Sequence, residues 1–129
     1  MRHFFIILVC LWAATASAQH YIPGDLIGKW QGVDQHRLFA IIEFINDHQA
    51  DLSSNGPQRV RFNYTADFNR HPFWLDLYRD SAGQRSYLKG LIQFIDKSHL
   101  KWQIFPAGNR PNNFIDDSGN LIILTKKRS

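Results

Sequence analysis

Residues 59–68, Arg-Val-Arg-Phe-Asn-Tyr-Thr-Ala-Asp-Phe, carry the clearest structural pattern in the chain. Apolar side chains stand at every second position from Val60 to Phe68, and polar ones fill most of the positions between them. Successive side chains of a β-strand point to opposite faces, so this alternation predicts a strand with one buried and one wet face. The segment therefore indicates a sheet that packs on one side.

The same kind of pattern continues in both directions from this strand. Working outward, we expect further strands at residues 26–33, 38–46, 49–53, 73–79, 86–95, 99–105 and 121–127. Turn residues such as Asp80-Ser81-Ala82-Gly83 separate them, and a short helical turn is expected over residues 21–25. About eight consecutive antiparallel strands form a barrel or a sandwich. Closure removes exposed edges, so the prediction is an all-β, antiparallel up-and-down barrel.

Residues 1–18 resemble a secretory signal peptide. Arg2 supplies the positive start, residues 4–14 form a short apolar run, and Ala16-Ser17-Ala18 offers small residues to a signal peptidase. We expect cleavage after Ala18 and a mature domain over residues 19–129, located in a bacterial periplasm or secreted. No segment of the mature chain has the length and apolarity of a transmembrane helix.

The composition excludes several classes of function. The only cysteine, Cys10, lies in the predicted signal, so the mature chain has neither disulfides nor thiol chemistry. Fourteen basic residues against eleven acidic ones leave a net charge of +3 after cleavage. The only basic cluster is Lys126-Lys127-Arg128 at the end, which is typical of a solvated tail. Without a basic stripe, nucleic-acid binding is not expected.

Several short motifs resemble one family, in order along the chain. Gly28-Lys29-Trp30 is similar to the G-x-W of lipocalin and calycin first strands. The segments 71–77, 90–94 with 100–102, 110–114 and 124–128 resemble motifs of a bacterial family of small secreted lipocalin-like domains, largely of unknown function. The turn Asp96-Lys97-Ser98 departs from that pattern because it has no glycine. The resemblance implies a lipocalin-like barrel and export rather than a particular activity.

The resemblance also implies a structural role for the first strand. In such barrels the tryptophan closes one end, here Trp30, and a basic residue from the last strand lies across the indole. Lys126 and Arg128 share one face of an extended strand, so either is a candidate. Gly28 and Gly32 share the face of Trp30 and permit a close backbone approach.

The inward side chains are the candidate ligand site. A small hydrophobic ligand would contact Phe44, Phe62, Tyr64, Leu75, Leu77, Ile92, Phe94 and Trp102. Their expected inward neighbours are Ile42, Val60, Phe68, Leu100 and Ile104. Barrels of eight strands are either filled by such side chains or hold one small ligand, and the sequence leaves both open.

The sequence does not predict an enzyme, a metal site or a cofactor. The mature histidines His20, His36, His48, His71 and His99 lack a metal-ligand spacing. Glu43, the only glutamate, and Asp76 lie in apolar strands, where an acid is either a base with a raised pKa or simply faces water. No nucleophile–base pair is recognisable, so both acids are expected to face water.

Two outward features suggest contacts with other molecules. Trp74 and Tyr78 share a strand face with Asp76, so they either contact a protein or glycan or are covered by the N-terminal segment. Arg110 lies in a loop bounded by Pro106 and Pro111. This loop either closes the barrel mouth, meets a partner or, as we expect, is an ordinary surface loop.

The leading hypothesis is therefore an exported, non-catalytic, lipocalin-like protein that binds a small hydrophobic ligand. The alternative is a partner-binding periplasmic protein, such as a protease inhibitor or an immunity-type protein. Similar small barrels inhibit metalloproteases through a free N-terminal segment, and residues 19–23 would take that part. Those inhibitors carry a disulfide, which this chain cannot form.

Overall fold

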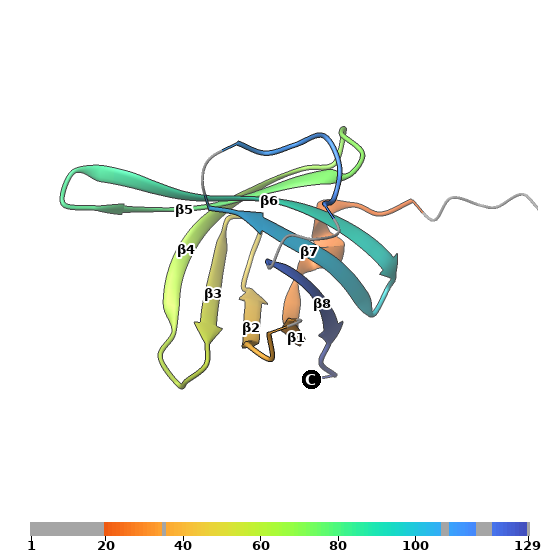
Figure 1. Cartoon of the computed structure of the whole chain (residues 1–129), viewed down its shortest axis with the longest axis horizontal. Helices are drawn as coiled ribbons and strands as arrows, with labels where there is room; N and C mark the ends of the chain where they lie inside the picture. The colour runs from red at the N-terminus through yellow and green to blue at the C-terminus, as the bar shows by residue number, and fades with distance from the viewer. Residues whose placement is uncertain (1–19, 35, 107–108, 116–119, 129) are drawn as a thin grey trace, which may run out of the picture.

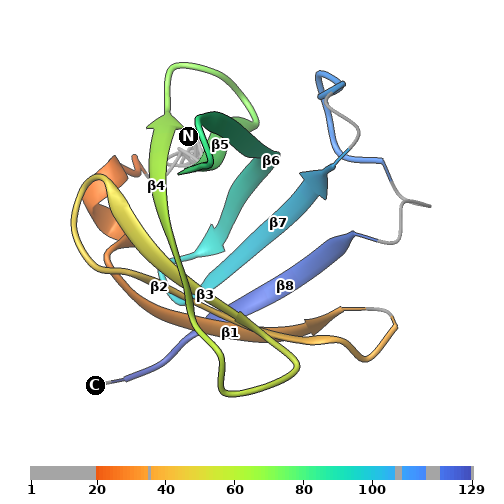
Figure 2. The ribbon, with the colours of Figure 1, turned by 90° about the vertical axis from the view of Figure 1, so that its left-hand side faces the viewer.

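The fold is a closed antiparallel β-barrel, as the sequence predicts. The computed structural model describes residues 20–34, 36–106, 109–115 and 120–128. Each strand pairs with the next, and β1 pairs with β8 (Figures 1 and 2). The strands are β1 (Gly28–Asp34), β2 (Phe39–Phe44), β3 (Gln49–Ser54), β4 (Val60–Asp67), β5 (Phe73–Ser81), β6 (Gln84–Asp96), β7 (His99–Phe105) and β8 (Leu121–Lys126).

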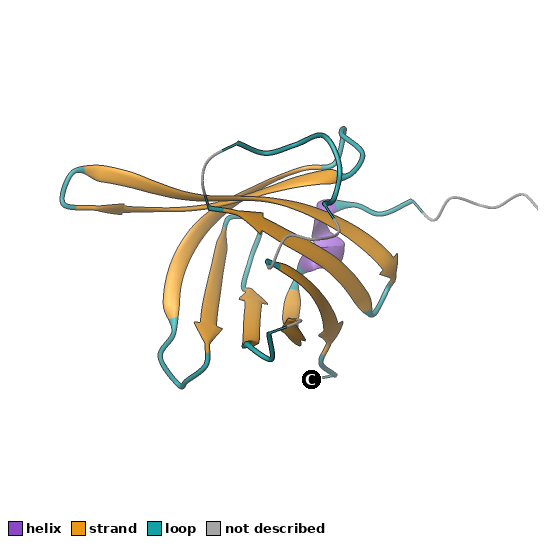
Figure 3. Ribbon diagram, viewed as in Figure 1, coloured by secondary structure: helices purple, strands orange, loops and turns teal. Residues whose placement is uncertain are grey.

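A short 3₁₀ helix, η1 (Pro23–Leu26), precedes β1 and is the helical element drawn in Figure 3. The helical turn predicted near the start is thus confirmed, although it ends one residue later and shortens the first strand. Pro23 suits this position because its fixed φ is compatible with a first helical turn. None of the helical structure in the described part of the chain is long and apolar enough to cross a membrane. Residues 1–18, the predicted signal peptide, lie outside the described residues.

The β5–β6 hairpin is longer than the sequence pattern indicates. Pairing runs out to Ser81 opposite Gln84, whereas the alternation predicts strands ending at 79 and resuming at 86. Ala82 and Gly83 both have positive φ, 54° and 78°. Two such residues form the tight turn whose twist matches that of paired strands, so the ladder continues to the tip.

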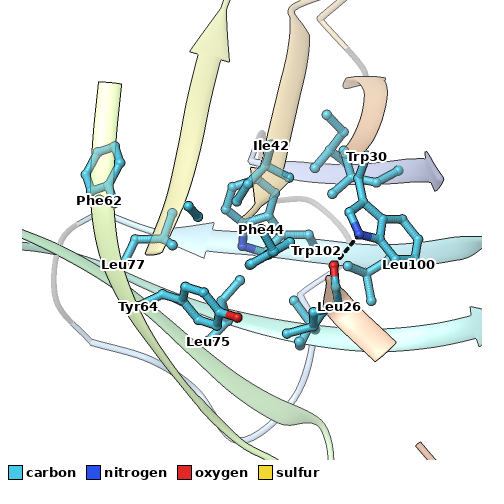
Figure 4. Close-up of a cluster of buried hydrophobic side chains, with 14 of the residues drawn as sticks. Leu26, Trp30, Ile42, Phe44, Phe62, Tyr64, Leu75, Leu77, Leu100 and Trp102 are labelled. Atoms are coloured by element: carbon cyan, nitrogen blue, oxygen red, sulfur yellow. Dashed lines mark hydrogen bonds between the residues drawn. The ribbon is translucent and has the colours of Figure 1, made fainter. Parts of the chain in front are cut away.

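Trp30 closes one end of the barrel, as predicted. Its side chain is fully buried, and its Nε1–H donates a hydrogen bond of 2.8 Å to the carbonyl oxygen of Leu26 in η1 (Figure 4). The edge of its ring meets Phe94, with centroids 6.1 Å apart. The helical turn and the first strand are therefore joined through one indole.

The cation beside this indole is Lys126. The register places Lys126 directly opposite Trp30, and its Nζ lies 5.4 Å from the ring centroid. Of the two candidates, Lys126 is therefore confirmed and Arg128 does not take this role, because Arg128 lies beyond the end of β8 and is exposed. Gly28 makes room for the lysine: a Cβ there would lie 2.9 Å from Lys126 Cε, and its φ of 130° disfavours other residues.

Candidate functional site

The eight predicted ligand-contacting residues all belong to the barrel core. Each is buried, with exposed fractions from 0 to 9%. They pack against one another; Phe44 and Tyr64, for example, meet edge to face with centroids 5.0 Å apart (Figure 4). The other inward residues of the sequence prediction also lie in or against this cluster. The middle of the barrel is thus occupied by its own side chains, and the space for a ligand lies toward the ends.

A small depression lies at the end of the barrel where β1, β3 and β7 end and β2 and β8 begin. Its volume is about 180 Å³, and Phe39, Leu52, Trp102 and Ile104 are among its lining residues. Ligand pockets for drug-sized molecules measure about 300–1,000 Å³. This depression is therefore smaller than an ordinary ligand pocket.

The opposite end offers more room, in a hollow that we call the rim groove. It has a volume of about 400 Å³ and opens where β5 begins and β6 ends. Its apolar lining consists of Pro72, Phe73, Ile92 and Phe94. Its polar lining consists of Tyr21, His71, Gln93 and Asn113. Apolar walls with a few placed polar groups are typical of small-molecule sites.

One wall of the rim groove comes from the N-terminal segment. The ring of Tyr21 stacks on Phe94, with centroids 4.3 Å apart and planes only 10° apart. Ile22 follows, and its N–H donates to Asp25 Oδ2 at 2.9 Å. The stacking fastens Tyr21 to the barrel, and the hydrogen bond closes the helical turn that follows it. The prediction of a free arm over residues 19–23 is therefore contradicted at Tyr21, whereas Ile22 and Pro23 are exposed and residue 19 lies outside the described residues.

Another wall comes from the connection between β4 and β5. Phe68 stacks on Phe73 with centroids 4.0 Å apart, which supports Phe73 from behind. His71 lies at the lip, 5.4 Å from the same ring. The groove thus has an aromatic floor whose rings are braced by neighbours rather than free to turn.

The third wall, at Asn113, depends on the loop after β7, which Arg110 anchors. The Arg110 side chain is only 7% exposed and pairs with Asp76 on the outer face of β5. It also donates to the Gly90 carbonyl oxygen at 3.2 Å. Farther along the loop, Ile115 makes two hydrogen bonds with the buried side-chain amide of Gln103. The amide donates to the Ile115 carbonyl oxygen at 2.8 Å and accepts from the Ile115 N–H at 2.9 Å. The expectation of an ordinary surface loop is therefore wrong, because the Arg110 side chain is buried against β5 and the Ile115 backbone is bonded to Gln103.

Trp74 is covered by two arginines. The guanidinium carbon of Arg110 lies 3.6 Å from the indole centroid, and that of Arg70 lies 3.7 Å from it. Two planar groups so close to one centroid must lie on opposite faces of the ring. Trp74 and Asp76 therefore fasten the loop to the outer sheet face, with the indole between two cations.

Several acidic residues of the described chain lie beside an arginine or a histidine. Glu43 lies on the outer face of β2, 3.8 Å from Arg59. His48 holds the pKa of Asp47 below its usual range, and His99 does the same for Asp96, in each case mainly through a side-chain hydrogen bond. Within the described ranges, no three His, Cys, Asp or Glu residues are grouped as metal ligands.

Comparisons of the chain with protein-family models, with curated proteins and with solved structures give no match. Membership of the lipocalin-like family stays a prediction. The groove residues Tyr21, His71, Gln93 and Asn113 were not singled out as ligand contacts from the sequence, because they lie far apart along the chain. Three of them lie in the motifs at 71–77, 90–94 and 110–114, and the ion pair between Arg110 and Asp76 joins the first of these motifs to the last.

Proposed function

We propose that this chain is an exported, non-catalytic barrel protein that binds a small hydrophobic ligand in the rim groove. The observation that carries the proposal is the groove itself, about 400 Å³ of aromatic-lined space beside a packed core. That volume falls within the range of small-molecule sites. The apolar run and small-residue site of residues 1–18 support export.

The lining chemistry favours an uncharged ligand. Among the described residues that line the groove there is no Asp, Glu, Lys or Arg to pair with a charged group. A charge placed against these aromatic walls would lose hydration without gaining a partner, which is costly. Gln93 and Asn113 supply amide groups that orient a ligand by hydrogen bonds. We therefore expect an apolar body with a small number of neutral polar groups.

Binding is tested by filling the groove. Asn113→Phe places a ring in the space, whereas Asn112→Phe puts the same ring on the neighbouring exposed residue, which does not line it. Titration with the neutral fluorescent probe N-phenyl-1-naphthylamine measures binding to each variant. We expect Asn113→Phe to weaken binding at least about tenfold and Asn112→Phe to leave it unchanged, since a filled pocket cannot admit the probe.

Two results would count against the proposal. One is a protein that binds no neutral apolar probe and carries no co-purifying small molecule by native mass spectrometry. The other is equal binding by the two asparagine variants, which would place the probe elsewhere. Near-ultraviolet circular dichroism of both variants checks that the barrel is intact.

A further inference from the structure

The β5–β6 hairpin extends beyond the rest of the barrel. Pairing between β4 and β5 stops at Asn63 opposite Tyr78, and pairing between β6 and β7 stops at Lys89 opposite Phe105. The ribbon beyond these points is paired only with itself, as far as its tip at Ser81 and Gln84. Figure 1 shows it projecting to one side. The strands of the barrel therefore part between β4 and β5 at this end.

A hollow lies where they part, and we call it the hairpin notch. It has a volume of about 350 Å³ and is lined by Phe62, Arg79, Ser81, Ser86, Tyr87 and Leu88. Phe62 and Leu88 belong to or pack against the buried core, so they form an apolar floor. Arg79 and the two serines supply donors around it. The notch lies at the far end of β5 from the rim groove.

Arg79 differs from the other arginines of the strands. Arg61 pairs with Asp51, and Arg85 pairs with Asp80. In the described part of the chain, Arg79 takes part in none of the ion pairs, and its guanidinium carbon lies 5.8 Å from the Phe62 ring centroid. None of the described residues that line the notch is acidic either. The site therefore combines an unpaired cation with an apolar surface.

We propose that the hairpin notch binds a small organic acid, with its carboxylate on Arg79 and its apolar body on Phe62 and Leu88. A guanidinium recognises a carboxylate through two parallel hydrogen bonds, and the serine hydroxyls provide further donors. The volume of the notch suits a molecule of modest size. This ligand differs in charge from the uncharged one proposed for the rim groove, so the two sites are chemically separate.

The test compares three ligands of equal length and different charge. Octanoate, octanol and octylammonium are titrated into the isotopically labelled full mature chain, and chemical shifts are followed at Phe62, Arg79 and Leu88. We expect octanoate to bind tightest and octylammonium weakest. Arg79→Gln should weaken octanoate binding about tenfold, the loss expected for a partly exposed charge-assisted interaction. The Asn113→Phe variant should bind octanoate normally, which separates this test from that of the rim groove.

Arg85→Gln is the matched control, because it removes a cation from the same hairpin that is already paired with Asp80. It should leave octanoate binding within about twofold of the unmodified protein. The proposal is overturned if octanoate does not bind at millimolar concentration or binds no better than octanol. It is equally overturned if the two arginine variants behave alike, or if the shifts appear at Phe73 and Phe94 instead.

Discussion

Replacing Arg110 with methionine tests how the loop beside the rim groove is held. Methionine keeps an apolar stem and removes the guanidinium contacts with Asp76, Gly90 and Trp74. Removing one partner of a fully buried ion pair costs about 3–5 kcal/mol. The Asp76 side chain is 24% exposed, so water relieves part of this cost once the partner is gone. We therefore expect Arg110→Met to lower the free energy of unfolding by about 2–3 kcal/mol.

Arg70 provides a control on the other face of the same indole. Its ion pair with Asp67 is exposed, with 54% and 42% of the two side chains accessible. Exposed pairs contribute about 0–1 kcal/mol, and an exposed cation–π contact contributes about 0.5–1 kcal/mol. Arg70→Met should therefore lower the free energy of unfolding by about 1 kcal/mol. Arg110→Met and Arg70→Met each remove a guanidinium from the Trp74 indole, and they differ mainly in how deeply the ion pair of that guanidinium is buried.

Urea denaturation followed by circular dichroism measures both losses. The double variant Asp76→Ala/Arg110→Met should be less destabilised than the sum of its single variants, since neither partner is then left buried alone. Probe binding to the rim groove should also weaken in Arg110→Met, because the loop carries Asn113. The reasoning would be refuted if Arg110→Met and Arg70→Met lowered the free energy of unfolding equally. It would also be refuted if Arg110→Met lowered it by less than about 0.5 kcal/mol.

Three further predictions concern the barrel itself. Trp30→Ala should lower the free energy of unfolding, measured by urea denaturation, by about 3–5 kcal/mol because of the cavity it leaves. Lys126→Met should lower it by only about 0.5–2 kcal/mol, the size of a cation–π contact. Equal losses of stability would contradict the closing role of the indole. Asp51, whose pKa is lowered chiefly by its hydrogen bond with Arg61, should stabilise the fold above about pH 4 and progressively lose that effect in acid. Melting temperatures of Asp51→Asn and the unmodified protein should then converge toward pH 2, and a constant difference would exclude this linkage. Burial raises the pKa of Tyr64, so the neutral phenol stabilises the fold below about pH 10 and this effect is lost as the pH rises further. The melting temperature of Tyr64→Phe should therefore fall less at alkaline pH than that of the unmodified protein.

The barrel and its inward faces were predictable from the sequence because strand alternation is local. The residues from Val60 to Phe68 specify which side of β4 is buried whatever lies beside it. Lys126 and Arg128 show the limit of such reasoning. The sequence pattern puts both on one face of an extended strand, but β8 ends at Lys126, and only its register with β1, which is a long-range property, places Lys126 opposite Trp30.

The rim groove was not predictable for a related reason. Its polar groups come from an N-terminal segment, a connection, a strand and a loop, and their meeting depends on where the loop after β7 runs. That course is set by Arg110 reaching Asp76, two residues 34 positions apart. A charged residue in a proline-bounded loop and an acid on an outward strand face were each visible in the sequence. Nothing local indicated that they pair.

A packed core has a consequence for both proposed sites. Phe73 at the rim groove and Ser81 at the hairpin notch are eight residues apart on β5, or about 26 Å at the usual rise of an extended strand. Leu75 and Leu77 lie between them, buried among the core residues, so no ligand passes from one site to the other. Sites this far apart with no shared contacts are expected to act additively. Occupying the rim groove should therefore leave octanoate binding at the notch unchanged, and a strong coupling between the two would mean that the barrel interior opens on binding.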